Sequence, residues 1–460
     1  MTIVPAILQQ MPAVRQPQWK FLAVLFATIL ALRGRVTGRN LRRYCDYSER
    51  TMARQFRASF DWPDFHQRIM NAALDPRSDL ISAQDASFIP KSGKQTFGLG
   101  HFFNGCANRA ERGLEISALA VVDVTRRCAF TLAVRQTPPG DDKAATAQDK
   151  EETRIDFYQQ QLREQRQRLP ERIKYHCVDG YFAKKNYIEE VVALKLPPIT
   201  KLRCDADCRF LYPGPPPQRR GRRRKYDGKV HFHDLQRFES LGPLAEAPHV
   251  HLSTALVWHG SLKRKLRVVV LVNRKNPAKP CYILLASTAL ELDGRKSVEL
   301  YAARFQIEFL FRDSKQFTGL SDCQARAQAA LDFHFNASLA TLNLARAEEL
   351  LAAPDQSPQI FSMASWKQRK FNERLLDLFI ELRGSLWTRL GSKITLVMTN
   401  SVLTALSPPD FCPNYCMVIK LVFLSLVSNL GTTPAAESAS PIKPLRAPHP
   451  GGLEINMSVL

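Results

Sequence analysis

The sequence predicts an α/β protein in which a β-rich insertion interrupts the core and a helical domain precedes it. Helical patterns fill residues 1–75, strands and helices alternate over 76–212, and strand patterns follow a basic loop in 213–292. Helical periodicity returns at 293–352 and continues in part through 353–460. We therefore expect an N-terminal helical domain, a core in two parts separated by the insertion, and a C-terminal region.

The N-terminal domain is expected to consist of short helices. Residues 21–33, 37–43 and 48–60 have helical patterns, and Thr37 and Ser48 are suited to be N-caps. Short arginine-rich helices joined by tight turns are typical of helix-turn-helix units that contact DNA. An ordinary small helical bundle is the alternative interpretation.

The first part of the core contains the pattern of a ribonuclease-H-like fold. Its predicted elements are a strand at 80–89, a hairpin of 115–124 and 128–136, a helix at 148–168, a strand at 175–179 and a helix at 186–196. This order matches three antiparallel strands, a crossover helix and a parallel strand. The first and fourth strands carry Asp85 and Asp179, and acids at the ends of these strands lie side by side in that architecture.

The remaining elements are less regular. Predicted strands in the insertion cover 250–259, 266–273 and 282–288, and predicted helices follow at 321–351 and 365–382. Two apolar stretches, 394–403 and 417–427, have no assigned role. The stretch 431–452 is rich in Ala, Ser and Pro, so we expect it to be disordered.

The chain carries a large excess of positive charge. Its 65 Lys and Arg residues outnumber 43 Asp and Glu residues, which gives a formal net charge of +22. Such an excess indicates a polyanionic partner, either a nucleic acid or an anionic membrane surface. Charge concentrates at 213–226, where Pro and Gly exclude regular structure and Arg222, Arg223 and Arg224 lie in sequence. We expect this loop to bind a nucleic-acid backbone rather than to be only a solvated loop.

The sequence also indicates a cytoplasmic protein. The longest apolar run, 21–32, is too short to span a bilayer and lacks the small-residue cleavage site of a signal peptide. The ten cysteines are scattered without a regular framework, which fits a reducing compartment. The basic residues cluster in loops and around an acid, whereas a membrane-surface protein would have basic amphipathic helices.

The stretch 301–315 places one acid among basic side chains. At about 100° per residue, Tyr301, Arg304, Glu308 and Lys315 fall within roughly 60° on a helical wheel. Arg312 lies close to the same face. A carboxylate ringed by cations and a phenol suits metal binding among groups that hold phosphates. A solvated helix face with i,i+4 ion pairs is the alternative.

Three acids stand out by their positions: Asp85, Asp179 and Glu308. Three carboxylates without a thiolate favour a hard, oxygen-binding divalent cation such as Mg²⁺. Two such ions about 3.5–4 Å apart can activate a water or a 3′-hydroxyl and stabilise the leaving oxygen of a phosphodiester. The pattern therefore indicates phosphoryl transfer without a covalent nucleophile on the protein.

The spacing within 301–315 resembles a known signature. Tyr301-x2-Arg304-x3-Glu308-x6-Lys315 is similar to the Tyr-Arg-Glu-Lys signature of DDE transposases from bacterial insertion sequences, insertion sequence family four. The segments QDASFIPKSGK, CVDGYFAK and GRRRKYDG, which contain the two aspartates and the basic loop, also resemble segments of that family. The resemblance covers roughly residues 80–350.

The resemblance implies a ribonuclease-H-like core in which Asp85, Asp179 and Glu308 hold two Mg²⁺ or Mn²⁺ ions. Tyr301, Arg304 and Lys315 would hold phosphates near the cleaved end. The implied reaction is nicking at terminal inverted repeats and attack of the released 3′-hydroxyl on target DNA. The implied partners are double-stranded DNA and a second copy of the chain in a synaptic homodimer, in the bacterial cytoplasm at the nucleoid, with no membrane.

Several residues admit other interpretations. Asp123 ends a hairpin strand and is an alternative first acid, although Asp85 fits the family order better. The other candidates are two solvated acids (Asp205 and Asp207), a zinc set (Cys204, Cys208, His231 and His233), a packed or capping histidine (His334) and an aromatic residue of the insertion (Trp258). Trp258 matches no motif of the family. At the level of function, a nuclease without strand transfer and a DNA-binding relic compete with an active transposase.

Overall fold

The computed structural model describes residues 3–140, 153–214, 224–275, 281–352 and 361–390. The chain divides into two compact units, and the first, within Met1–Leu375, contains the sheet and the candidate site. The second unit, Leu376–Gly452, includes the C-terminal part of the last described helix. The apolar stretches at 394–403 and 417–427 and the stretch at 431–452 lie outside the described residues.

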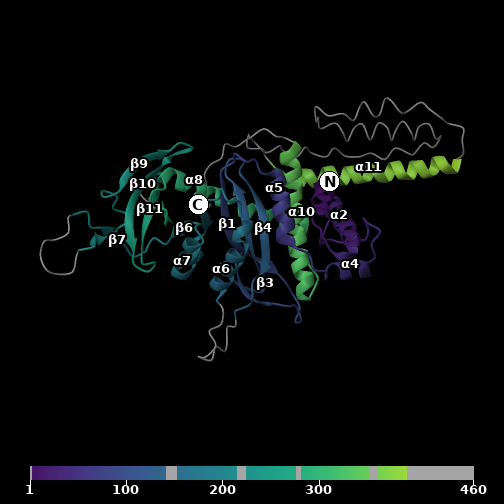
Figure 1. The fold of residues 1–460 in the computed structure, drawn as a ribbon, viewed down its shortest axis with the longest axis horizontal. Helices are drawn as coiled ribbons and strands as arrows, with labels where there is room; N and C mark the ends of the chain where they lie inside the picture. The colour runs from purple at the N-terminus through teal and green to yellow at the C-terminus, as the bar shows by residue number, and fades with distance from the viewer. Residues whose placement is uncertain (1–2, 141–152, 215–223, 276–280, 353–360, 391–460) are drawn as a thin grey trace, which may run out of the picture. The chain divides into compact units, whose positions relative to one another are not determined.

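The N-terminal segment is helical, as predicted. Its helices are α1 (Ile3–Gln9), α2 (Gln16–Ala31), α3 (Gly38–Leu41), α4 (Glu49–Gln55) and α5 (Trp62–Ala73) (Figure 1). The predicted N-caps are confirmed, because the Thr37 and Ser48 hydroxyls accept the backbone N–H groups of Asn40 and Thr51. Helix α4 ends at Gln55, before the predicted end at residue 60.

The described strands form one mixed sheet. They are β1 (Leu80–Pro90), β2 (Gly100–Asn104), β3 (Arg109–Asp123), β4 (Cys128–Gln136), β5 (His176–Val178), β6 (Pro198–Leu202), β7 (Cys208–Leu211), β8 (Tyr226–Lys229), β9 (Glu239–Leu244), β10 (Ala247–His259), β11 (Arg264–Asn273) and β12 (Cys281–Ser287). Their order is β2-β3-β1-β5-β6-β12-β11-β10-β7-β8, with β4 on β3 and β9 on β10. Five of them, β2, β6, β7, β8 and β9, were not predicted.

The centre of the sheet has the predicted order of strand directions. Strand β1 pairs antiparallel with β3, β3 pairs antiparallel with β4, and β1 pairs parallel with β5. The strands of the predicted insertion are part of the same sheet, because β12 pairs antiparallel with β6 from Leu284↔Leu202 to Ser287↔Ile199. The strands of the insertion therefore extend the sheet of the core.

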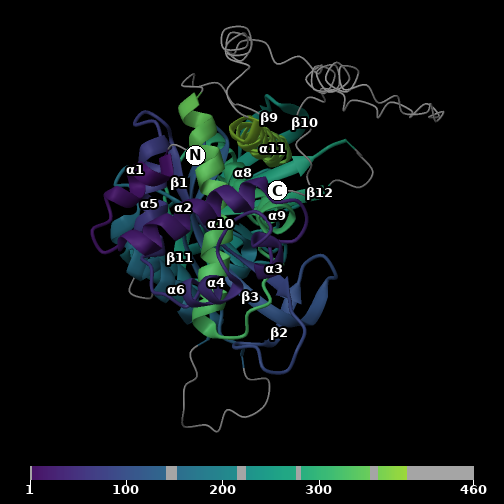
Figure 2. The same cartoon turned by 90° about the vertical axis from the view of Figure 1, so that its right-hand side faces the viewer.

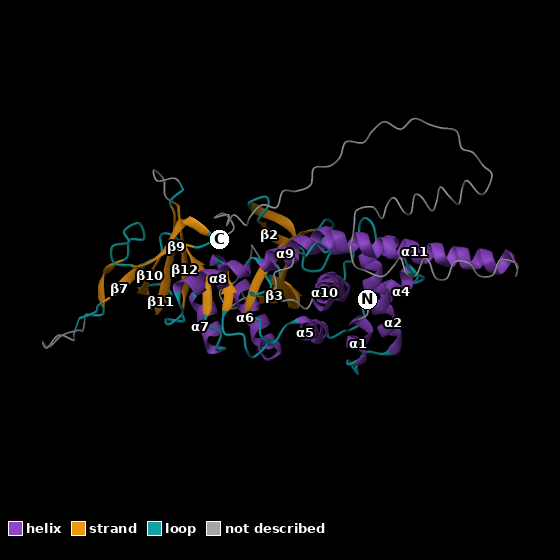
Figure 3. Ribbon diagram, turned by 90° about the horizontal axis from the view of Figure 1, so that it is seen from above, coloured by secondary structure: helices purple, strands orange, loops and turns teal. Residues whose placement is uncertain are grey.

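Helices cover both faces of the central strands. Helices α6 (Arg154–Gln165) and α7 (Lys185–Ala193) share one apolar cluster with the N-terminal helices, and α8 (Gly294–Arg304) and α9 (Gln306–Asp313) belong to a second cluster (Figures 2 and 3). Neighbouring residues of β3 alternate between the clusters, with Leu119 and Val121 in the first and Ala118 and Ala120 in the second. This alternation is the period-two pattern of a strand that is covered on both faces.

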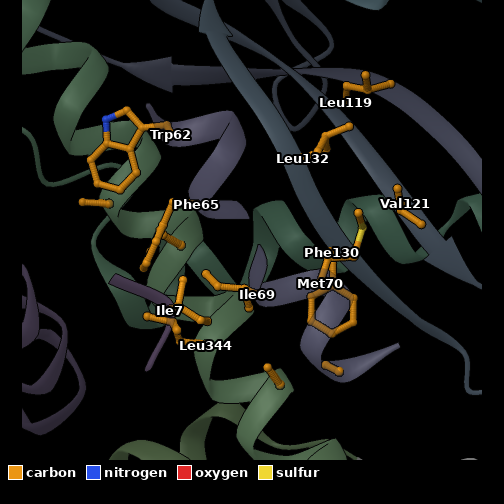
Figure 4. Packing of buried hydrophobic residues seen from close by; sticks show 14 of the residues in the cluster. Ile7, Trp62, Phe65, Ile69, Met70, Leu119, Val121, Phe130, Leu132 and Leu344 are labelled. Carbon is orange, nitrogen blue, oxygen red and sulfur yellow. The ribbon is translucent and has the colours of Figure 1, made fainter. Parts of the chain in front are cut away.

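A long helix, α10 (Gln328–Ala352), joins the N-terminal helices to the sheet. Figure 4 shows Phe65 and Ile69 of α5 beside Leu344 of α10, with Phe130 of β4 close by. All four side chains are fully or almost fully buried. The N-terminal helices and the core therefore share one hydrophobic cluster.

Two predicted helices differ from the observed ones in their extent or continuity. The predicted helix at 321–351 begins only at Gln328, because tertiary partners use the backbone carbonyls before it. The ammonium of Lys91 donates to the carbonyl oxygens of Cys323 and Ala325 at 2.5 and 3.0 Å. The predicted continuous helix at 301–315 is also broken, at Phe305, where i→i−3 hydrogen bonds replace α-helical ones. A π-helical turn, Ser314–Thr318, follows α9.

Smaller differences concern element ends. The helix predicted at 148–168 is observed as α6 and the 3₁₀ turn Arg166–Arg168, and residues 148–152 lie outside the described residues. The last described helix, α11 (Met363–Leu390), is longer than the predicted 365–382.

Candidate active site

The three predicted acids come from three elements of the first unit. Asp85 lies in the middle of β1, so its predicted place at a strand end is wrong. Asp179 directly follows β5 and accepts the backbone N–H of Tyr181 at 2.9 Å. Glu308 lies in the first turn of α9.

The register of β1 and β5 places the two aspartates next to each other. The strands pair in parallel at Ser82↔His176 and Ala83↔Cys177. Asp85 and Asp179 each follow the first of these pairs by three residues. Ala83 and Cys177 belong to the cluster that α8 and α9 cover, and side chains alternate along a strand. The two acids therefore extend toward the same helices.

Arg304 connects the acid of the sheet to the acid of the helix. Its guanidinium donates to Asp85 Oδ2 at 3.2 Å and to Glu308 Oε1 at 2.8 Å. The Arg304 side chain is 7% exposed, whereas Asp85 is 19% and Glu308 is 40% exposed. The break at Phe305 separates α8, which carries Arg304, from α9, which carries Glu308.

The site holds more negative charge than Arg304 compensates. Burial raises the pKa of Asp85 to about 7; the charge of Arg304 opposes this rise, and the charges of Asp179 and Glu308 add to it. Burial also raises the pKa of the Glu308 carboxyl, again against Arg304 and with Asp179. Mutual repulsion and desolvation of this kind are relieved when a cation binds.

The other residues of the predicted signature occupy different surroundings. Tyr301 is buried below Arg304, whose guanidinium carbon lies 5.5 Å from the ring centre. Lys315 lies in the π-helical turn, and burial lowers the pKa of its ammonium. Arg312 is 60% exposed and pairs with Asp313 at 2.8 Å. These residues therefore do not form one exposed ring of cations around Glu308.

The predicted basic loop is described only at its edges. Arg222 and Arg223 lie outside the described residues. Arg224 pairs with Asp227 at 2.5 Å and lies over the ring of Tyr212. Beside it, Tyr226 lies 5.8 Å from Trp258 between ring centres.

A second basic and aromatic pair adjoins Asp179 and was missed in the sequence. Tyr181 is an exposed aromatic residue, and the ammonium of Lys184 lies 4.4 Å from its ring centre. Both residues belong to the segment CVDGYFAK, so their proximity to the aspartate was the available signal.

The alternative residues lie in other surroundings. Asp123 is fully buried at the end of β3, and its carboxylate accepts the backbone N–H of Arg126 at 2.8 Å. His334 is packed, as expected, and its Nε2 donates to the Gly319 carbonyl at 2.7 Å. Asp205 and Asp207 form ion pairs with Arg203 and Arg209.

Within the described ranges, no three His, Cys, Asp or Glu side chains are arranged closely enough to hold a metal ion. The three acids, with Arg304 between two of them, do not meet this condition in the structure, and neither do the four residues of the zinc set, Cys204, Cys208, His231 and His233. None of the helices in the described ranges combines the length and the apolar character needed to cross a membrane.

Residues 7–264, more than half of the chain, match the family model of DDE superfamily endonucleases. The chain belongs to the DDE superfamily endonucleases. The matched range includes Asp85 and Asp179 and ends before Glu308. Membership implies a nuclease that acts on DNA, and DDE endonucleases generally use divalent metal ions. No curated protein matches the sequence.

Proposed function

We propose that this DDE endonuclease is a transposase of the insertion-sequence type that cuts DNA at terminal inverted repeats and transfers the released ends. The observation that carries the proposal is that Arg304 bridges Asp85 of β1 and Glu308 of α9. Asp179, at the end of β5, lies beside Asp85 in the paired register, although the three carboxylates are not close enough in this structure to hold a metal ion. The two aspartates lie inside the family match, and Glu308 is joined to Asp85 through Arg304. The Tyr-Arg-Glu-Lys spacing supports the finer assignment to insertion sequence family four.

The strand order supports a ribonuclease-H-like core. The antiparallel strands β4, β3 and β1 are followed by α6 and then by β5, which is parallel to β1. In this proposal residues 76–212 and 293–352 are the two parts of the core, 213–292 is the insertion, and 1–75 is a DNA-binding domain. The arginines of α3 and α4 support the last assignment.

The donor set fits Mg²⁺ or Mn²⁺. Asp85, Asp179 and Glu308 provide only carboxylate oxygens, which hard divalent cations prefer. Burial raises the pKa values of Asp85 and Glu308, against the charge of Arg304 and with that of Asp179, and a bound cation would relieve this cost. When bound, one or two such ions would supply Lewis-acid activation of a water or 3′-hydroxyl and stabilisation of the leaving oxygen.

The chain's own basic residues would hold the DNA. Arg304 bridges Asp85 and Glu308, and we propose that it turns from the carboxylates toward a phosphate when a metal ion neutralises them. Lys315, Arg312 and the buried Tyr301 would support the same strand, as the signature implies. Guanidinium groups bind phosphate oxygens through paired N–H donors, so this exchange keeps the hydrogen bonds of Arg304 satisfied.

The basic loop would bind the DNA backbone outside the site. Arg222, Arg223 and Arg224 lie in sequence in this loop, and Arg224 is already placed beside Tyr212. Phosphate contacts of this kind position the duplex without reading its sequence. A homodimer that holds two DNA ends is part of the same proposal.

The test is cleavage of a DNA duplex that carries the end of the element and its flank, with Mg²⁺. Glu308→Gln should lower the rate by at least about 1,000-fold, because loss of a ligand charge removes about 4 kcal/mol of transition-state stabilisation. DNA binding should persist. Glu299→Gln is the matched control, because Glu299 is an exposed acid of α8 that pairs with Lys296.

The outcomes separate the competing functions. Cutting at the repeat boundary followed by joining to a target supports a transposase, and cutting without joining supports a nuclease. Binding without cutting by the wild type would indicate an inactive relic. Equal cutting by wild type and Glu308→Gln would exclude Glu308 as the catalytic acid.

A further inference from the structure

A closed circuit of hydrogen bonds lies on the face of β1 opposite Asp85. Ser82 Oγ lies 2.9 Å from His176 Nδ1, and His176 Nε2 lies 2.9 Å from the Tyr187 hydroxyl. The Tyr187 hydroxyl donates to Gln84 Oε1 at 2.7 Å. The circuit starts on β1, crosses to β5 and α7, and returns to β1 two residues further on.

The directions of the bonds in the circuit follow from its neighbours and from the charge state of His176. Gln84 Nε2 donates to the Tyr158 carbonyl and to Gln161 Oε1, both at 3.1 Å, which leaves Gln84 Oε1 as an acceptor. Because the Tyr187 hydrogen points to that oxygen, His176 Nε2 must be the donor to Tyr187. Burial lowers the pKa of His176, so the ring is neutral and its Nδ1 accepts a hydrogen from the Ser82 hydroxyl, which also lies 3.3 Å from the Tyr175 carbonyl oxygen.

The circuit is buried and fully paired. Ser82, Gln84, His176 and Tyr187 all have a relative exposure of 0%. Replacing such a set by apolar side chains of similar shape is often nearly neutral for stability, because desolvation offsets much of the gain from hydrogen bonding. The circuit contributes mainly to structural specificity, because all of its hydrogen bonds form only in one relative arrangement of β1, β5 and α7.

The backbone alone specifies the pairing of β1 with β5 weakly. Strand β5 has three residues and pairs with β1 at two positions. A slip of one residue would shift one strand by about 3.3 Å and move its side chains to the opposite face. Because Ser82 and His176 are a paired position, their hydrogen bond exists in the observed register only.

We propose that Ser82, His176 and Tyr187 are positioning residues that fix the register of β1 and β5 and thereby the separation of Asp85 and Asp179. The hydrogen bond between Ser82 and His176 in this circuit lies three residues before both acids, on the opposite face of the sheet. It acts through the strands and touches neither DNA nor metal. The inference rests on the proposed function, because it assigns the two aspartates to one metal-binding site.

The test compares two tyrosine variants. Tyr187→Phe removes the hydroxyl that joins β5 and α7 to β1. Tyr158→Phe is the control, because its buried hydroxyl donates to Glu115 at 2.7 Å, and that bond joins α6 to β3 rather than β5 to β1. Tyr187→Phe loses two hydrogen bonds of a buried hydroxyl and Tyr158→Phe loses one, so both variants should lower the stability, and only Tyr187→Phe should change metal binding.

Three measurements distinguish positioning from stability. We expect Tyr187→Phe to weaken Mn²⁺ binding, measured by electron paramagnetic resonance without DNA, by about 10-fold. Its kcat for cleavage should fall by a similar factor with the Kd for DNA unchanged, and higher Mn²⁺ concentrations should restore part of the rate. Tyr158→Phe should match the wild type in all three measurements, even if its Tm falls.

The result that overturns the inference is a Tyr187→Phe protein with wild-type Mn²⁺ affinity. If Tyr187→Phe does not fold, Ser82→Ala removes the first bond of the same circuit and takes its place. Failure of the proposed function looks different, because then the wild type itself does not cut DNA. Equal Mn²⁺ affinity of wild type and variant would refute the positioning role of the circuit, whether or not the wild type cuts DNA.

Discussion

The two faces of β1 solve the problem of burying polar groups in opposite ways. On one face, Asp85 shares a single guanidinium with Glu308, and its pKa is raised to about 7. On the other face, Ser82 and Gln84 belong to a circuit of uncharged side chains that are hydrogen-bonded to one another. One face of the strand therefore carries carboxylates whose charge a single guanidinium does not balance, and this face is suited to bind a cation. The other face carries polar groups that are all hydrogen-bonded.

The largest effect on stability is expected from Gln161→Leu, on the side of β1 opposite Asp85. Gln161 is fully buried and receives the Ser117 hydroxyl at 2.6 Å and the Gln84 amide at 3.1 Å. Its loss leaves both donors without this acceptor, which should lower the free energy of unfolding by about 3 kcal/mol. Urea denaturation measures the change, and the exposed neighbour Gln160→Leu should lie within about 0.5 kcal/mol of the wild type.

The face of β1 that carries Asp85 should respond differently, because a metal ion can replace the missing cation. Arg304→Gln should lower the free energy of unfolding by about 2 kcal/mol without metal, a partial cost because Glu308 is 40% exposed. Mg²⁺ should stabilise this variant more than it stabilises the wild type, since no guanidinium competes for the carboxylates. Thermal unfolding with and without Mg²⁺ measures both effects, and equal stabilisation of the two proteins would contradict the exchange proposed for Arg304.

Acid should destabilise the neutral face. Burial lowers the pKa of His176 to about 3, below the ordinary 6.5 of an unfolded chain. The unfolded state therefore binds the proton first, and stability falls as the pH drops from 6.5 toward 3. At pH 5 this histidine should cost about 2 kcal/mol relative to neutral pH.

Denaturant titrations of the wild type and His176→Gln across this pH range test the effect. The variant should lose less stability in acid than the wild type. The variant should still lose some stability in acid, because burial also lowers the pKa of His66 to about 3 and this histidine is present in both proteins. Parallel pH profiles of the two proteins would argue against a neutral His176.

The smallest effect on stability is expected at Arg312. Its guanidinium is 60% exposed, so Arg312→Gln should change the free energy of unfolding by less than about 1 kcal/mol. If Arg312 contacts a phosphate, the variant should bind DNA more weakly and lose about one unit from the slope of log K against log salt. An unchanged salt slope would remove Arg312 from the DNA-contacting residues.

The core of this site could be predicted from local patterns. The run around Asp85 and the short run before Asp179 have strand patterns, and the antiparallel and parallel pairings followed from the order of elements. The family match at 7–264 agrees with the assignment of a DDE endonuclease. These features depend on residue periodicity, which a single sequence displays.

The remaining features depend on contacts between distant residues. The break at Phe305 and the bridge from Arg304 to Asp85 follow from docking a helix on a strand 219 positions away. The circuit through His176 and Tyr187 is equally non-local, because both residues look like ordinary members of a buried strand and a helix. Strand β2, with its short length and Gly100, offered too little periodic pattern to be recognised.

The pairing of β12 with β6 connects the strands of the predicted insertion to the candidate site. Strand β6 holds β12 at one edge and β5 at the other, so an uninterrupted ladder runs from the insertion to the strand that ends at Asp179. Deleting the insertion would expose the edge of β6 and leave its backbone groups unpaired. In the proposed function, a displacement of β12 would be transmitted to Asp179 through the paired strands β6 and β5.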